Sequence, residues 1–293
     1  MPHHDARPPV VLLPGFWHGT WCWSPVAAEL TARGRRAVAV DLPGHGLEAR
    51  PPASARARPF DPEDFATEPS LTAGITLESA TEHLLERVER IGGGGPCVVV
   101  AHSGAGPVAV QAVEKAPHLF ARAVYVCAFM PTAGLPAMAY ISAPENAGEK
   151  ATPALRADLS TVGTMRLDPG SPDPDYRVHL RDLFYNDVDA AVADAAIALL
   201  SPDGPIGIMA GTTEVTDKGW GSVPRTFVVG TRDNAVRPDL QRRFIAEADA
   251  RFPRTATDIV ELDSSHAPFL SMPERLAEVI DTADERDGRD GRA

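Results

Sequence analysis

The serine at position 103 stands where a chain typically presents a nucleophile. A β-branched run at 98–100 leads into this residue, and a helical pattern follows it at once. A sharp turn between strand and helix would hold the Ser103 hydroxyl clear of the backbone, because small neighbours allow the turn to close. The segment is a variant of G-x-S-x-G with alanine at both outer positions. By itself this segment is consistent with a nucleophile or with an ordinary strand-to-helix turn, so the assignment of Ser103 depends on other residues.

A serine hydroxyl needs a base within hydrogen-bond reach, and that base needs an orienting acid. His266 follows the last predicted strand and precedes the last predicted helix, which places it at the carboxyl edge of the sheet. Asp233 lies just past the preceding predicted strand, where a turn carboxylate is the alternative role. Asp263 and Glu261 are rival acids, but they lie too near His266 in sequence to reach it across the sheet. We therefore predict Ser103 as nucleophile, His266 as base and Asp233 as acid.

The negative charge that develops on a carbonyl oxygen needs two fixed hydrogen-bond donors. One is expected to be the N–H of Gly104, directly after the nucleophile. The other is expected from the glycine-containing loop 14–19, with the N–H of Phe16 as first candidate and that of Trp17 as second; a tight turn with aromatic packing is the alternative reading. The side chains of Trp17 and Phe129 are predicted to line the substrate pocket.

Two other histidines near these motifs are not expected to be the base. His102 precedes Ser103 and should point to the other side of the strand, since successive side chains alternate. His45 lies in a turn after the second predicted strand. No Cys/His/Asp spacing indicates a metal, and neither a P-loop nor a dinucleotide fingerprint occurs. We therefore expect no metal and no cofactor.

The composition narrows the class of protein. The 293 residues are 44% hydrophobic, enough for one large domain or one domain with an insert. The net charge of −12 argues against nucleic acid and anionic membranes as partners. Three cysteines are too few for a disulfide framework, and no secretory signal or membrane-spanning run is evident. These features predict a cytoplasmic protein; its arginine-, alanine- and proline-rich composition suggests a GC-rich bacterial genome. Its oligomeric state stays open.

Short apolar runs alternate with helical patterns along the chain. Strands are expected at 9–13, 37–41, 96–102, 123–127, 226–230 and 257–262. Helices are expected at 23–33, 77–91, 106–116, 238–250 and 273–283. Continuous rather than alternating apolar strands are typical of a sheet covered on both faces. The pattern predicts the α/β class, with a mainly parallel, six-stranded, doubly wound sheet.

Two stretches interrupt this alternation. Residues 48–74, rich in Pro, Ala and Arg, are expected to form a long, partly disordered surface loop. Residues 130–223 contain helical patterns near 174–185 and 187–200 and little that resembles a strand. We interpret 130–223 as a mostly helical cap over the site, with a decorative insertion as the alternative; 1–129 and 224–293 then form the core. The polar tail 284–293 is expected to fray.

The chain resembles the α/β-hydrolase superfamily, and more narrowly the plant-type methylesterases, hydroxynitrile lyases and their bacterial esterase relatives. The resemblance lies in four segments: 10–23, the turn at Ser103, 219–225 leading to Asp233, and 265–273. It implies the α/β-hydrolase fold. The hydroxynitrile lyases carry a lysine where this chain has Ala267 and a threonine where it has Gly15. The resemblance therefore implies hydrolysis rather than cyanohydrin cleavage.

The expected activity is cofactor-independent hydrolysis of an ester or lactone of a moderately hydrophobic small molecule. Two alternatives remain open on the same fold. One is a non-hydrolytic tailoring enzyme of secondary metabolism, acting by C–C cleavage, cyclisation or acyl transfer. The other is a small-molecule receptor. Fold resemblance gives a reaction class and not a substrate.

Overall fold

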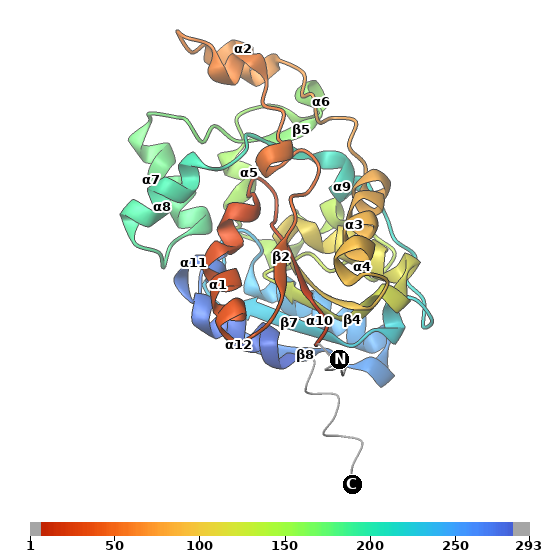
Figure 1. The fold of residues 1–293 in the computed structure, drawn as a ribbon. Helices are drawn as coiled ribbons and strands as arrows, with labels where there is room; N and C mark the ends of the chain where they lie inside the picture. Colours follow the sequence, from red (N-terminus) through yellow and green to blue (C-terminus); the bar gives the residue numbers. More distant parts are fainter. Residues whose placement is uncertain (1–6, 284–293) are drawn as a thin grey trace.

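The computed structural model describes residues 7–283, and a six-stranded parallel sheet forms their centre (Figure 1). The strand order is β2-β1-β3-β4-β7-β8, and each neighbouring pair is parallel. The strands are β1 (Val10–Leu13), β2 (Ala37–Ala39), β3 (Cys97–His102), β4 (Phe120–Val126), β7 (Arg225–Gly230) and β8 (Asp258–Leu262). All six predicted strands are present, so the predicted fold class is confirmed.

The central strands are buried along their length because helices cover both faces of the sheet. Every residue of β1, β3 and β7 is buried, as expected for strands covered on both faces. The parallel register places the ends of β1 and β3 side by side, with Leu13 opposite Ala101. The loops that follow these two strands therefore begin at the same edge of the sheet.

Four long helices connect strands of the sheet and a fifth follows the last strand, all near the predicted positions. They are α1 (Ser24–Ala32), α3 (Leu77–Gly92), α4 (Gly106–Lys115), α10 (Pro238–Arg251) and α12 (Pro273–Ala283). In Figure 1, α1 packs with α12 on one side of the sheet, and α3 packs with α4 on the other. Thr76 starts α3 with a capping box that it shares with Ser79, which satisfies free N–H groups of the first turn. The short helix α11 (Pro268–Ser271) follows β8.

Residues 130–223 lie between β4 and β7, and helices make up most of their regular secondary structure, although much of the segment is irregular. The segment contains α5 (Ala151–Ala154), α6 (Leu159–Val162), α7 (Pro174–Phe184), α8 (Ala190–Ala198) and α9 (Ile206–Ala210). It also contains β5 (Thr164–Arg166) and β6 (Asp203–Pro205), which pair antiparallel. Sequence patterns gave little sign of these strands because each has three residues, too few for a period-two pattern to be visible.

Residues 48–74 run along the surface, as expected, but the expectation that they are partly disordered is wrong. This stretch forms α2 (Pro62–Thr67) and buries the side chains of Phe65 and Ser70. Its anchor is Arg166 of β5, whose guanidinium donates to the carbonyl oxygens of Phe65 and Glu68, each at 2.7 Å. The same guanidinium holds both carboxylate oxygens of Asp203, at 2.7 and 2.9 Å. The buried guanidinium of Arg166 therefore holds residues 48–74 in place, although their composition alone is typical of a loop.

No helix among residues 7–283 combines the length and apolar character that crossing a bilayer requires. The tail 284–293, which sequence analysis expected to fray, lies outside the described residues.

Candidate active site

Ser103 occupies a strained turn between β3 and α4. Its φ is +52°, in the left-handed region that residues other than glycine rarely adopt. Its neighbours make this geometry possible: a Cβ added at Gly106 would lie 1.8 Å from the carbonyl oxygen of Phe129. The side chain is 8% exposed and lines a pocket. Strain of this kind persists only where the surroundings enforce it, and it often marks a functional position.

Asp233 and His266 form a buried pair at the ends of β7 and β8. His266 Nδ1 lies 2.8 Å from Asp233 Oδ2. The other carboxylate oxygen of Asp233 accepts the N–H groups of Ala235 and Val236, at 2.7 and 3.0 Å. These bonds fix the carboxylate, which in turn orients the imidazole. The two predicted residues are thus brought together, although they are 33 positions apart in the chain.

Gln241 of α10 completes the surroundings of Asp233, and sequence patterns did not reveal it. Its Nε2 donates to Asp233 Oδ2 at 3.0 Å and to the carbonyl of Val236 at 2.7 Å. Its Oε1 accepts the N–H of Gly230 at 3.2 Å. A polar residue on the otherwise apolar inner face of a helix was the available signal, because such a buried amide requires partners.

His102, directly before Ser103 in the chain, packs against His266. No hydrogen bond joins the Ser103 hydroxyl to His266 within residues 7–283. The rings of His102 and His266 pack with centroids 4.5 Å apart. His102 Nδ1 accepts the N–H of Gly15 at 3.2 Å, and Nε2 lies 2.8 Å from the carbonyl of His266. Burial lowers the pKa of His102 well below its usual value, so this ring is neutral and acts as a bridge between two loops.

The loop after β1 packs directly against the turn at Ser103. A Cβ at Gly15 would lie 2.6 Å from Ser103 Cβ, and one at Gly104 would lie 2.7 Å from the ring of Phe16. Both glycines are therefore required for this close approach. No acceptor for the N–H of Phe16 is found in the part of the chain that the structure describes. The two predicted donor residues, Phe16 and Gly104, thus lie next to each other beside Ser103.

The rival acids lie elsewhere. Asp263 is exposed and pairs with Arg232 at 3.0 Å. Glu261 pairs with Arg242 at 2.9 Å. His45 is buried, and burial lowers its pKa to about 4. Its Nδ1 lies 3.2 Å from the carbonyl of Pro43.

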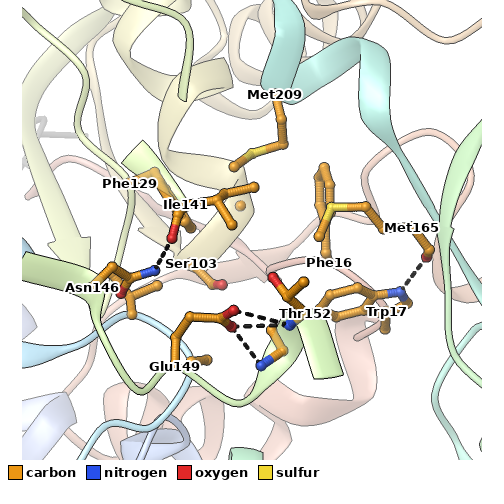
Figure 2. Close-up of a pocket in the computed structure, with 14 residues that line it drawn as sticks. Phe16, Trp17, Ser103, Phe129, Ile141, Asn146, Glu149, Thr152, Met165 and Met209 are labelled. Carbon is orange, nitrogen blue, oxygen red and sulfur yellow. Dashed lines mark hydrogen bonds between the residues drawn. The ribbon is translucent and has the colours of Figure 1, made fainter. Parts of the chain in front are cut away.

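The pocket at Ser103 is small and mostly apolar (Figure 2). Trp17 and Phe129, the two predicted pocket residues, both line it. The indole N–H of Trp17 donates to the carbonyl of Met165 at 2.9 Å. The remaining lining residues come from the core loops and from 130–223: Phe16, Ser103, Gly104, Ile141, Asn146, Glu149, Ala151, Thr152, Met165, Met209, Ala235 and Val236.

The segment 130–223 is also attached to the loops that carry the acid and the base. Asp187 accepts the N–H of Ser265 at 3.0 Å, directly before His266. The amide of Asn234 donates to the carbonyl of Asp182 at 2.9 Å. Its position over the site, together with these bonds, agrees with the interpretation as a cap; that interpretation stays a prediction.

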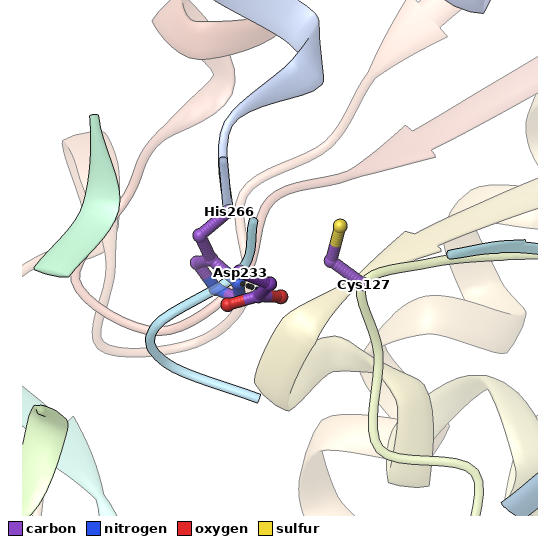
Figure 3. Close-up of side chains that lie close together, drawn as sticks. All are labelled: Cys127, Asp233 and His266. Atoms are coloured by element: carbon purple, nitrogen blue, oxygen red, sulfur yellow. Dashed lines mark hydrogen bonds and ion pairs between the residues drawn. The ribbon is translucent and has the colours of Figure 1, made fainter. Parts of the chain in front are cut away.

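Cys127 lies against the acid and base (Figure 3). Its Sγ, a carboxylate oxygen of Asp233 and a ring nitrogen of His266 all lie within 4.8 Å of one another. Burial raises the pKa of this thiol well above its usual value, so it is protonated at neutral pH. Since Asp233 and His266 already bind each other, the cluster is an acid-base pair with a neighbouring thiol. The expectation of no metal stays a prediction.

The sequence matches a model of the α/β hydrolase family over residues 10–279. Similar curated proteins are Methylesterase 9 and Methylesterase 7 of Arabidopsis thaliana. The first is 27% identical over 271 residues and the second 29% over 283, each covering 92% of this chain and 94% of the relative. A solved pyrethroid hydrolase, PytH, superimposes with a TM-score of 0.73 at 22% identity, covering 96% of this chain and 99% of the other.

The chain belongs to the α/β hydrolase family. The comparisons confirm the predicted family and the expectation that the protein is an enzyme of the hydrolase class.

Proposed function

We propose that the protein is a cofactor-independent serine hydrolase that cleaves an ester or lactone of a moderately hydrophobic small molecule. The observation that carries this proposal is the fixed Asp233–His266 pair beside a strained serine in an apolar pocket. The esterase relatives support ester hydrolysis as the reaction class. The apolar lining supports a small hydrophobic substrate.

In the proposed mechanism the Ser103 hydroxyl attacks the carbonyl carbon of the substrate. His266 Nε2 accepts the hydroxyl proton and later gives it to the leaving alcohol, while Asp233 orients the ring and stabilises its cationic form. The N–H groups of Phe16 and Gly104 bind the oxyanion. A water molecule, deprotonated by His266, then attacks the acyl-enzyme and releases the acid. Because catalytic hydrogen bonds often tighten only with substrate bound, the contact between Ser103 and His266 is expected to form in the complex.

Activity-based labelling tests the nucleophile directly. A fluorophosphonate probe should label the wild-type protein on a peptide containing Ser103, and Ser103→Ala should abolish the label. The same variant should lower turnover of p-nitrophenyl esters by about 10⁴-fold or more. Ser142→Ala, which removes an exposed hydroxyl outside the pocket, is the matched control and should behave like wild type. Unchanged turnover in Ser103→Ala would exclude the mechanism.

The two alternative functions predict different outcomes. Hydrolysis in ¹⁸O-labelled water places one labelled oxygen in the acid product, whereas cyclisation or acyl transfer does not. A receptor would bind its ligand tightly without turnover. The proposal includes a cytoplasmic location, which fractionation of cells that express the protein tests.

A further inference from the structure

The polar side chains of the pocket are unevenly distributed. The lining includes one ionisable carboxylate, that of Glu149, and within the described residues no lysine, arginine or histidine. Asn146 makes two hydrogen bonds within the protein: its Nδ2 donates to the carbonyl of Ile141 and its Oδ1 accepts the N–H of Arg237, both at 3.0 Å. Its amide is neutral and adds no charge to the pocket. The charge within the pocket is negative and comes from one residue.

The Glu149 carboxylate retains capacity to bind a ligand. Its Oε2 accepts the N–H groups of Ala151 and Thr152 at 2.7 and 3.0 Å, whereas from residues 7–283 Oε1 receives a single long bond, 3.3 Å from the N–H of Thr152. An ionised carboxylate can accept about four hydrogen bonds. In Figure 2, Glu149 and Thr152 lie together on one side of the pocket, while Met209 and Ile141 lie on the opposite side of Ser103 in the view.

We infer that Glu149 selects substrates by charge and that the natural substrate is an apolar ester carrying an ammonium group. This inference rests on the proposed function and specifies its substrate class. The apolar side chains would hold the hydrocarbon part, and Oε1 would accept a hydrogen bond from the cation. An ester with a carboxylate at the same place would meet uncompensated repulsion, because the pocket lining has no cationic side chain to offset it.

Three p-nitrophenyl esters with acyl chains of equal length, ending in a methyl, ammonium or carboxylate group, test the inference. The ratio of kcat/KM for the cationic ester to that for the anionic ester should fall about tenfold in Glu149→Gln, a change expected for a partly hydrated charge. Glutamine keeps an oxygen that accepts the N–H groups at 151 and 152, so α5 retains its first turn. Comparing the ratio between proteins cancels the intrinsic reactivity of each ester.

Two controls separate local charge from general effects. Glu214→Gln removes an exposed carboxylate outside the pocket lining and should leave the ratio unchanged. Raising the ionic strength from about 0.01 M to about 1 M should weaken the preference of wild type for the cation, because the Debye length falls from about 30 to about 3 Å. The same ratio in wild type and Glu149→Gln, within twofold, would overturn the inference while the neutral ester still reports hydrolysis.

If wild type turns over none of the three esters, the proposed hydrolysis fails separately. Calorimetric titration with n-hexylammonium then decides the inference, since binding needs no turnover. The affinity should fall about tenfold in Glu149→Gln. Equal affinities in the two proteins would refute a role of Glu149 in selecting charge.

Discussion

Acidification should destabilise this protein well before its carboxylates titrate. His18 and His45 are buried, and desolvation is the main cause that lowers their pKa values from 6.5 to about 3 and about 4. His102 is shifted in the same direction. In the folded state His18 Nδ1 lies 3.0 Å from the carbonyl of Phe16 and Nε2 lies 2.7 Å from the hydroxyl of Tyr185. The contact with the Phe16 carbonyl raises the pKa of His18, but burial outweighs it.

The sign follows from proton uptake on unfolding. The folded pKa values lie below the unfolded value of 6.5, so the unfolded state binds more protons and stability falls as the pH falls from 6.5 toward the folded values. At pH 5, which is about 1.5 units below the unfolded pKa, protonation of each histidine in the unfolded state lowers the free energy of unfolding by about 2 kcal/mol. The combined loss of about 4 kcal/mol, with a further loss from His102, is a large part of the 5–15 kcal/mol typical of a domain.

Urea denaturation followed by tryptophan fluorescence at pH 7.5, 6.5, 5.5 and 5.0 would measure this loss. We expect a nearly flat unfolding free energy above pH 6.5 and a steep fall below it. On unfolding, His18→Gln should take up about one proton fewer than wild type, so its unfolding free energy should fall less steeply below pH 6.5. The variant should also be less stable than wild type at pH 7.5. His118→Gln, which removes an exposed histidine, is the control and should keep the wild-type slope. An unfolding free energy that changes by less than about 1 kcal/mol between pH 7.5 and 5.0 would refute the reasoning.

Three further substitutions test how the site and its surroundings are built. Gln241→Leu should lower kcat about tenfold with little change in KM, because it removes a donor to the acid but no pocket contact; an unchanged kcat would show that the acid needs no such support. Gly15→Ala places a Cβ 2.6 Å from that of Ser103, so the loop and its N–H donors must shift. Esterase assays should then show a rate of hydrolysis lower by about 10²-fold or more. Wild-type rates would show that the loop accommodates the Cβ without cost. Arg166→Met leaves its partner carboxylate buried and unpaired, which should cost about 3–5 kcal/mol in urea denaturation, whereas a cost below about 1 kcal/mol would argue against an anchoring role.

The sheet and the candidate triad could be read from the sequence because both depend on local order. Continuous β-branched and apolar runs indicate strands that are buried on both faces, and such runs ended at Ser103, Asp233 and His266 or just before them. In a parallel sheet the carboxyl ends of all strands share one edge, so chain order alone predicts which loops meet. Asp233 and His266 are indeed joined at that edge.

What only the tertiary structure decided depends on contacts between distant segments. The residue pair Arg166 and Asp203 fixes the stretch 48–74, although neither lies within it and composition there indicates a loop. Gln241 contacts Asp233 because helix α10 packs against the loop that carries this residue. Glu149 lines the same pocket as Ser103, although the two residues lie in distant parts of the chain. Local propensity and periodicity act over a few residues, whereas burial of a charge or the placing of a pocket wall is settled by packing between elements, which no single stretch of sequence contains.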